Sequence, residues 1–394
     1  MERSWEQAEA GLVAVRVDAD VPEARWDRSG REAGLVQLWL DGAYHQDIIL
    51  ARGEDRGCYE RLVGRLDGGR HTLEIRPAPV GAPVLPTARI HGVEVVPLVP
   101  RDRWEAMAWE QAPVLWTRGE SDPWESLSTD TPLALFYRPD GDGVEFQCIF
   151  SHEDAGTDTR GLLAQWGRTT DIEWILALAP GGAATYQGPG HRTLSHGGHR
   201  ELGRLALSVV GRHGMVSDTA PRGAMRCLFL PRFRWDPRLP RETSMEDWMY
   251  RLTAMELARQ GRLPVVDETR GAHIGDLGHY LFLQLLRSDE DAPAIPLDIQ
   301  VLGQDGALYR SSGGDWSQAV ARRGPWATTV RIPPAVAPAQ ILAVPSRPLQ
   351  MGRIRLALYR GFRLDSDLLP APEGLPQGRP VDLLPGADRV TLWP

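Results

Sequence analysis

Five side chains that can transfer protons lie close together between residues 150 and 173. His152, Glu153 and Asp154 directly follow an apolar run, and Asp171 and Glu173 come later in the same segment. Strand ends and the loops behind them are where catalytic groups collect. We therefore predict an acid–base site, with Glu153 or Asp154 as general acid and Asp171 or Glu173 as base or nucleophile. His152 would transfer protons or bind a metal.

The same segment contains residues that could hold a substrate. Arginine can clamp an anionic group, and aromatic rings can stack on the apolar face of a sugar. We assign substrate-binding roles to Arg160, Trp166, Arg168 and Tyr186. An alternative interpretation gives the same residues a purely structural role. The acids would share one face of a strand and form surface ion pairs with these arginines, which are common and weak.

A cluster of histidines follows, because four of the ten histidines lie between His191 and His213. In His196-Gly-Gly-His199 the glycines let the backbone bend, which could bring both imidazoles to one ion. We predict that His191, His196 and His199 bind a divalent metal, although the acid–base chemistry requires no cofactor. The alternative is a solvated loop, since the spacing matches no known zinc motif.

The absence of lysine excludes several reaction classes. All 44 basic residues are arginine, so Schiff-base chemistry, pyridoxal-phosphate attachment and the Walker A grip on phosphate have no primary amine. The sequence also lacks a GxSxG elbow and a GxGxxG loop. Three widely spaced cysteines indicate neither a disulfide framework nor a structural zinc site.

Composition limits the partners. The net charge of −8, with arginines interspersed among acids, argues against nucleic acid. No apolar stretch is long enough to span a membrane, and the N-terminus lacks the apolar core of a signal peptide. We expect a soluble protein of the cytoplasm, or a secreted one if a signal has been removed. A carbohydrate or other small molecule is the expected partner, and the sequence does not give the oligomeric state.

The pattern of apolar residues predicts a mainly β fold. Short alternating runs over residues 11–96 indicate a β-sandwich, similar to a jelly roll, in a domain of residues 1–98. Residues 99–394 form a larger β-rich domain with the candidate site and a sub-boundary near 235–265. Asp102 and Glu105 have the spacing of a helix-capping box, and Asp158 or Thr157 could cap a short helix over 160–166.

The longest predicted helix covers residues 243–260, with Thr243 and Glu246 as a capping pair and Gly261 as the stop. Further strands are expected at 279–287, 297–302, 327–332, 340–344 and 353–364. A third polar set, His273, Asp276 and His279, is better explained by a turn that leads into the first of these strands.

Fourteen tryptophans, eight of them in or beside predicted loops and strand edges, favour a carbohydrate ligand. The leading hypothesis is a carbohydrate-active hydrolase or lyase. One alternative is a non-catalytic β-sandwich protein that binds glycan or protein. Another is a small-molecule cyclase or isomerase, in which buried carboxyls would have raised pKa values.

Overall fold

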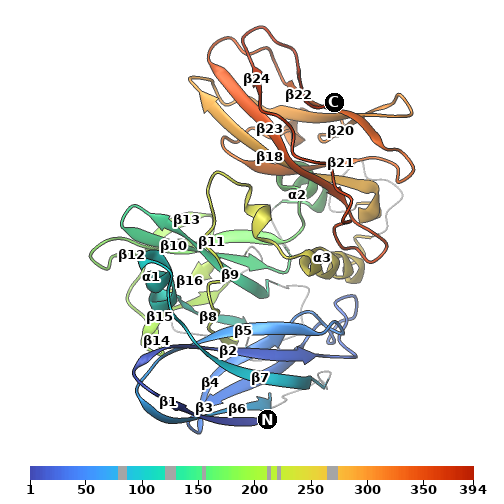
Figure 1. Cartoon of the computed structure of the whole chain (residues 1–394). Helices are drawn as coiled ribbons and strands as arrows, with labels where there is room; N and C mark the ends of the chain where they lie inside the picture. Colours follow the sequence, from blue (N-terminus) through green and yellow to red (C-terminus); the bar gives the residue numbers. More distant parts are fainter. Residues whose placement is uncertain (79–86, 120–129, 153–156, 211–213, 220–222, 264–273) are drawn as a thin grey trace. The chain divides into compact units, whose positions relative to one another are not determined.

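The computed structural model describes the chain except for residues 79–86, 120–129, 153–156, 211–213, 220–222 and 264–273. In the described residues, strands form six sheets and three α-helices contribute far fewer residues (Figure 1). The predicted mainly β fold is therefore confirmed. Two compact units are present, Met1–Asp154 with Asp171–Arg234 and Ala155–Thr170 with Trp235–Pro394. The predicted boundary at residue 98 falls inside the first unit and stays a prediction.

The first unit begins with two antiparallel sheets that share one core. Val13, Val15 and Val17 of β2 point into this core from one sheet, and Val36 and Leu38 of β3 from the other. Because each sheet buries one face against the other, this part is a β-sandwich. Its likeness to a jelly roll stays a prediction. The sheet orders are β1-β6-β3-β4 and β5-β2-β7. The strands are β1 (Glu2–Gln7), β2 (Gly11–Asp20), β3 (Gly34–Leu40), β4 (Ala43–Leu50), β5 (Gly57–Leu66), β6 (Gly69–Pro77) and β7 (Arg89–Pro97).

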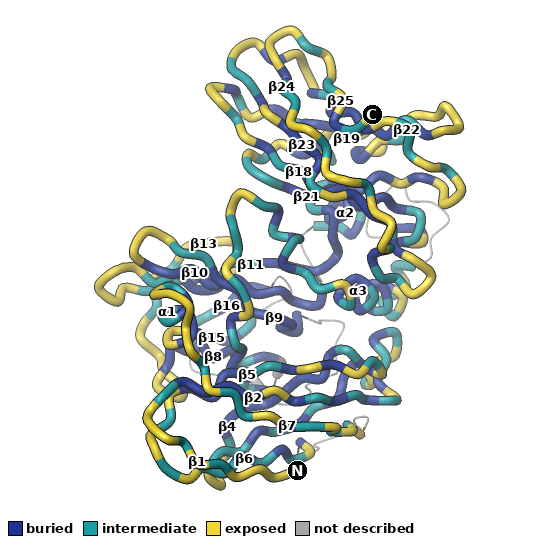
Figure 2. Tube along the Cα trace, in the orientation of Figure 1, coloured by how far each residue is buried: buried dark blue, intermediate teal, exposed yellow. Residues whose placement is uncertain are grey.

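Two further sheets complete the first unit. One has the order β13-β12-β11-β10-β9, and its strand β10 is buried along its whole length (Figure 2). In the other, β8 lies between β17 and β15, and it runs parallel to β15. The strands are β8 (Val114–Gly119), β9 (Pro132–Asp140), β10 (Gly143–Phe150), β11 (Asp171–Leu178), β12 (Ala184–Gly188), β13 (Arg192–Ser195), β14 (Arg200–Glu201), β15 (Arg204–Val209), β16 (Val216–Ser217) and β17 (Gly223–Cys227).

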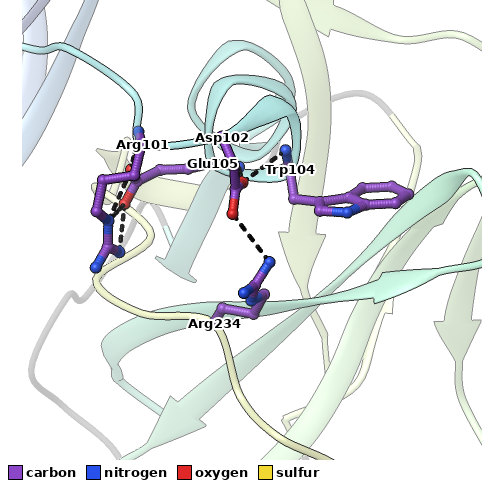
Figure 3. A network of polar contacts seen from close by, with 5 residues as sticks. All are labelled: Arg101, Asp102, Trp104, Glu105 and Arg234. Atoms are coloured by element: carbon purple, nitrogen blue, oxygen red, sulfur yellow. Dashed lines mark hydrogen bonds and ion pairs between the residues drawn. The ribbon is translucent and has the colours of Figure 1, made fainter.

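Helix α1 (Arg103–Gln111) is capped at both ends. The side chain of Asp102 accepts hydrogen bonds from the backbone nitrogens of Trp104 and Glu105, both 2.9 Å, and forms an ion pair with Arg234 (Figure 3). The predicted cap at Asp102 is thus confirmed, although Glu105 accepts from the backbone of Arg101 and not from that of Asp102. At the other end, Arg204 donates to the carbonyl oxygens of residues 109 and 110, both 2.8 Å.

The second unit contains a second pair of sheets around one core. Leu283 of β18 and Leu356 of β23 reach this core from one sheet, and Ile299 of β19 and Ile341 of β22 from the other. The sheet orders are β21-β18-β23-β24 and β20-β19-β22-β25. The strands are β18 (Tyr280–Glu290), β19 (Leu297–Gly303), β20 (Leu308–Arg310), β21 (Trp326–Arg331), β22 (Pro338–Pro345), β23 (Arg353–Arg363), β24 (Val381–Leu383) and β25 (Val390–Trp393).

Helix α2 (Thr159–Trp166) packs on β21 of the second unit. Asp158 is its N-cap, and the hydroxyls of Thr328 and Thr329 donate to carbonyl oxygens of its last turn. Gly167 ends the helix with φ of 60°. A Cβ at this glycine would lie 2.6 Å from the backbone nitrogen of Thr328, so only glycine lets the helix end lie this close to the strand.

The long helix of the second unit, α3 (Asp247–Arg259), begins later than predicted. Thr243 lies in a preceding 3₁₀ turn, η1 (Arg241–Ser244), where its hydroxyl donates to the carbonyl oxygen of Pro240. Glu246 occupies the N-cap position, and its side chain makes no capping hydrogen bond. The predicted capping pair is therefore wrong, because the threonine hydroxyl is used one turn earlier. Two other 3₁₀ turns are η2 (Leu277–His279) and η3 (Trp316–Gln318).

Candidate functional site

The predicted site residues are divided between the two units. The first unit holds His152, Asp171, Glu173, Tyr186, His191, His196 and His199, whereas the second holds Arg160, Trp166 and Arg168. Glu153 and Asp154 lie outside the described residues. The candidate site of the 150–200 segment therefore corresponds to two groups of side chains, one in each unit.

In the first unit, polar residues gather where β9 and β11 begin and β10 ends. The strand register places Phe150 of β10 opposite Pro132 of β9 on one side and opposite Asp171 of β11 on the other. Beyond this row, the backbone nitrogen of Ser151 donates to the carbonyl oxygen of Thr131 at 3.0 Å. The strand pairing thus brings together segments that are twenty residues apart in the sequence. We call Asp130, Thr131, Ser151, His152 and Asp171 the sheet-end cluster.

The titratable members of the sheet-end cluster are withdrawn from solvent. The exposed fraction is 0% for His152, 2% for Asp171 and 5% for Asp130. Charged and ionisable side chains are rarely buried this far unless they are paired or used in chemistry. Asp130 was missed by the sequence interpretation, and its one signal is its position just before a strand, in Asp130-Thr-Pro132.

Asp171 has close apolar and backbone neighbours. A Cβ built on Gly214 would lie 2.6 Å from Oδ2 of Asp171 and 2.7 Å from the ring of Phe150, so this glycine leaves the space that the carboxylate occupies. Burial, and secondarily the charge of Asp171, raises the pKa of the Cys148 thiol well above its usual range. The carboxylate is therefore buried beside the ring of Phe150, where its charge acts strongly on neighbours.

Glu173 has a different environment from Asp171. It is half-buried and accepts a hydrogen bond of 2.6 Å from the amide of Gln187 on β12, a residue that sequence analysis did not select. Gln187 also contacts Nδ1 of His191 at 2.9 Å. The alternative in which surface arginines pair with these acids is not supported for Arg168, whose carboxylate partner is Glu242.

The histidines of the predicted metal site have unequal surroundings. Both ring nitrogens of His196 bond to the backbone, Nε2 to the carbonyl oxygen of Ala206 at 3.2 Å and Nδ1 to the nitrogen of Gly198 at 2.9 Å. His191 contacts Gln187, and His199 is exposed. No group of three or more potential metal ligands is found among the described residues. Metal binding by these histidines stays a prediction.

Tyr186 supports the loop that carries His196. Its hydroxyl donates to Oδ1 of Asp218 at 3.2 Å, while the other oxygen of Asp218 accepts from the backbone nitrogen of Gly197. The rings of Tyr186 and His196 meet edge to face, with their centroids 6.1 Å apart. Tyr186 is only 6% exposed, and this burial is the main reason why the pKa of its hydroxyl is raised. The observed contacts of Tyr186 are structural, and its role in substrate binding stays a prediction.

In the second unit, two arginines lie against the ring of Trp166. The guanidinium carbon of Arg322 is 3.6 Å from the ring centroid, and that of Arg168 is 5.0 Å away. Nη1 of Arg168 donates to Oε1 of Glu242 at 2.8 Å, and both side chains are at least 96% buried. We call Trp166, Arg168, Glu242 and Arg322 the arginine–tryptophan cluster. Glu242 and Arg322 are too distant in sequence for any local pattern to have indicated them.

Arg160 lies at the start of α2 and contacts a glycine turn. Its Nη2 donates to the carbonyl oxygen of Ser312 at 3.1 Å, and a Cβ at Gly313 would lie 2.7 Å from the same nitrogen. This contact holds the start of α2 to the loop that precedes η3. A substrate-binding role for Arg160 stays a prediction.

The tryptophans expected to be available for sugar stacking differ widely in exposure. Trp26 and Trp326 are 2% and 1% exposed, and the indole of Trp26 donates to a backbone oxygen, so these two belong to cores. Trp316 is 40% exposed, so part of its side chain is accessible from solvent. Trp124 lies outside the described residues.

Comparison with known proteins gives no functional assignment: no family model matches the chain, and no curated protein matches its sequence. None of the helices in the described part of the chain is long and apolar enough to cross a membrane.

Proposed function

We propose that this chain is a carbohydrate-active enzyme that uses acid–base chemistry at the sheet-end cluster of the first unit. His152 would transfer the proton, and Asp171 would act as the base or nucleophile. The observation that carries this proposal is the burial of one imidazole and two carboxyl groups at a single end of one sheet. Burial shifts pKa values and strengthens electrostatic effects, which makes such groups useful in catalysis.

Asp130 extends the site beyond the residues selected from sequence. Hydrolysis of a glycosidic bond needs an acid for the leaving group and a second carboxyl for the anomeric centre. Asp130 and Asp171 are the two buried carboxyl groups of the sheet-end cluster. In the described part of the chain we therefore assign Asp171 as base or nucleophile and Asp130 as the acid whose proton His152 would transfer, with Glu153 and Asp154 as further candidates for the acid.

The carbohydrate part of the proposal draws support from the β-sandwich of the first unit and from the accessible side chain of Trp316. Both features are typical of proteins that bind glycans through stacking on a shallow surface. They support a substrate class and indicate no particular sugar.

The test compares two variants of the sheet-end cluster with one control. Asp171→Asn and His152→Gln keep side-chain size, and Glu145→Gln alters a carboxylate at the opposite end of β10 that pairs with Arg138. Turnover would be measured on nitrophenyl glycosides and on polysaccharides by release of reducing ends. We expect each site variant to lose roughly 10²-fold or more in kcat/KM, while the control keeps its activity. Circular dichroism would verify folding.

Unchanged turnover in both site variants would refute the assigned roles. If the native protein binds glycans without turnover, the non-catalytic alternative replaces the enzyme.

A second candidate is a small-molecule isomerase or cyclase, favoured by the contact of Asp171 with Gly214 and by its place opposite Phe150. A carboxyl that is enclosed in this way can exchange a proton with a small substrate out of contact with water. Mass spectrometry of the products separates the two candidates. Hydrolysis cleaves the substrate and adds the elements of water to its fragments, whereas isomerisation leaves the mass of the substrate unchanged.

A further inference from the structure

The arginine–tryptophan cluster has more positive than negative charge. The carboxylate of Glu242 forms an ion pair with Arg168, and its negative charge also acts on Arg322. In the described part of the chain, the carboxylate of Glu242 thus faces these two guanidinium groups in a partly buried setting, where like charges repel more strongly than in water.

Two hydrogen-bond donors of the cluster are unused. Nε of Arg168 and Nε of Arg322 are both buried and donate to no acceptor in the described structure. Arg168 is only 3% exposed, so water does not readily take the place of an acceptor. Buried donors without a partner are rare in folded proteins and call for a specific explanation.

The local backbone holds these donors in place. Trp166 and Arg168 flank Gly167, whose left-handed conformation turns the chain at the end of α2. Arg322 lies over the indole ring and also donates from Nη2 to the carbonyl oxygen of Gln165 at 2.8 Å. Both guanidinium groups are therefore fixed by stacking and by hydrogen bonds before any ligand arrives, which lowers the entropic cost of binding.

The cluster reaches the surface of the second unit. Trp166 and Arg322 are half-buried, whereas Arg168 and Glu242 are buried. A small ligand would therefore reach the cluster from the side of Trp166 and Arg322.

We propose that the arginine–tryptophan cluster binds the oxyanion group of a small molecule. The oxyanion would accept hydrogen bonds from the unused donors of Arg168 and Arg322 and would supply the missing negative charge. Guanidinium groups suit carboxylate, phosphate and sulfate, since their planar donors match two oxygens at once. The indole would contact the apolar part of the ligand. This proposal does not rest on the acid–base function, because the cluster lies in the second unit and is tested by binding alone.

The experiment measures binding to the full chain by isothermal titration at constant ionic strength. Glucuronate, inorganic phosphate and sulfate are the probes, and glucose is the neutral control. We expect saturable binding of at least one oxyanion and none of glucose. The preferred probe distinguishes a sugar acid from a phosphate or sulfate source.

Two variants locate the site. Arg322→Met keeps the aliphatic stem over the indole but removes the charge, and it should weaken binding at least tenfold. Arg353→Met is the matched control, because Arg353 is a half-buried arginine of the same unit that pairs with Glu290 and Asp382. It should bind as the native chain does.

A measurement on the native chain covers the case in which Arg322→Met does not fold. Phenylglyoxal modifies accessible arginines, and mass spectrometry reports the labelling of each one. The bound oxyanion should slow labelling of Arg322 at least severalfold and leave Arg353 unchanged. Absence of saturable binding, or equal affinity of native and Arg322→Met chains, or equal labelling of Arg322 with and without oxyanion, would overturn the proposal.

Discussion

His45 on β4 should make the first unit lose stability in mild acid. The imidazole is 7% exposed, and burial lowers its pKa to about 4, with smaller contributions from the charges of Arg226 and Arg204. Nε2 lies 3.0 Å from the carbonyl oxygen of Val63, and Nδ1 lies 3.3 Å from the amide nitrogen of Gln46. These partners require a proton on Nε2 and none on Nδ1, so they fit the neutral ring and oppose a second proton.

The pH window follows from the two pKa values. Above pH 6.5 the ring is neutral in both the folded and the unfolded chain, and it adds no pH dependence. Between pH 6.5 and about 4 the unfolded chain binds a proton that the folded chain does not, so the free energy of unfolding falls as pH falls. Below the folded pKa the loss is complete and amounts to about 3 kcal/mol, of which about 2 kcal/mol is already lost at pH 5.

The assay compares the native chain with His45→Gln at pH 7.5 and at pH 5. Hydrogen exchange of β4 peptides measures the free energy of opening the first unit, which avoids treating a two-unit chain as a two-state system. The change of the native chain between the two pH values should exceed that of the variant by about 2 kcal/mol. Because other titrating groups are common to both chains, their effects cancel in this difference.

His71→Gln is the matched control, because the pH dependence expected for His71 has the opposite sign. The hydrogen bond of His71 with Asp41 raises the pKa of this imidazole, so its contribution to stability is present below the unfolded pKa and is lost as pH rises. Compared with the native chain, His71→Gln should therefore lose more stability at pH 5 than at pH 7.5. Equal pH dependence of the native chain and His45→Gln would refute the burial argument.

Substitutions at three further places test individual contacts. Glu242→Gln leaves the buried guanidinium of Arg168 without its carboxylate and should destabilise the second unit by about 3–5 kcal/mol. Calorimetry should show this as a lower transition temperature, and adding Arg168→Met should recover much of the loss; no recovery would mean that the two charges are not coupled. Gly167→Ala should cost about 2 kcal/mol or more, because it combines a left-handed φ with a clash against the backbone of β21. Gly261→Ala, with the same kind of φ and open space, should cost only about 1 kcal/mol in urea unfolding, and equal losses would disprove the clash. Asp102→Ala should cost about 1 kcal/mol through the loss of the α1 cap, whereas Asp102→Asn should retain most of the stability in thermal unfolding. Equal melting temperatures of the alanine and asparagine variants would contradict the capping role.

Strands could be predicted where apolar residues dominate the local pattern. The apolar run of β18 allows few other structures, and this strand was predicted at 279–287, close to its observed position. β1 was missed, because Glu2–Gln7 is mostly polar and joins its sheet by pairing with β6. That pairing is a contact across some seventy residues and leaves no mark on the short sequence of β1 itself.

The same reasoning explains which parts of the candidate site the sequence could indicate. The density of polar residues in one sequence segment indicated His152 and Asp171. Both lie at the same end of the sheet because β10 and β11 are adjacent strands. Glu242 and Arg322 lie 74 and more residues from Arg168, and only the fold of the second unit brings them to it. Local sequence density thus detects groups that lie on strands close together in sequence, and it misses groups assembled across a domain.

Helix α2 accounts for the largest difference between the expected single site and the observed groups. Its residues interrupt the strand pair β10–β11 in sequence, yet its buried Leu163 joins the core formed by α3 and β18 in the second unit. The apolar face of so short a helix cannot be buried by the helix itself. Its packing partner therefore decides which unit it joins, and the hydroxyls of Thr328 and Thr329 complete its last turn from that side. Trp166 and Arg168 follow the helix, whereas Asp171 begins the next strand of the first unit. The six residues 166–171 thus supply one side chain to the sheet-end cluster and two to the arginine–tryptophan cluster.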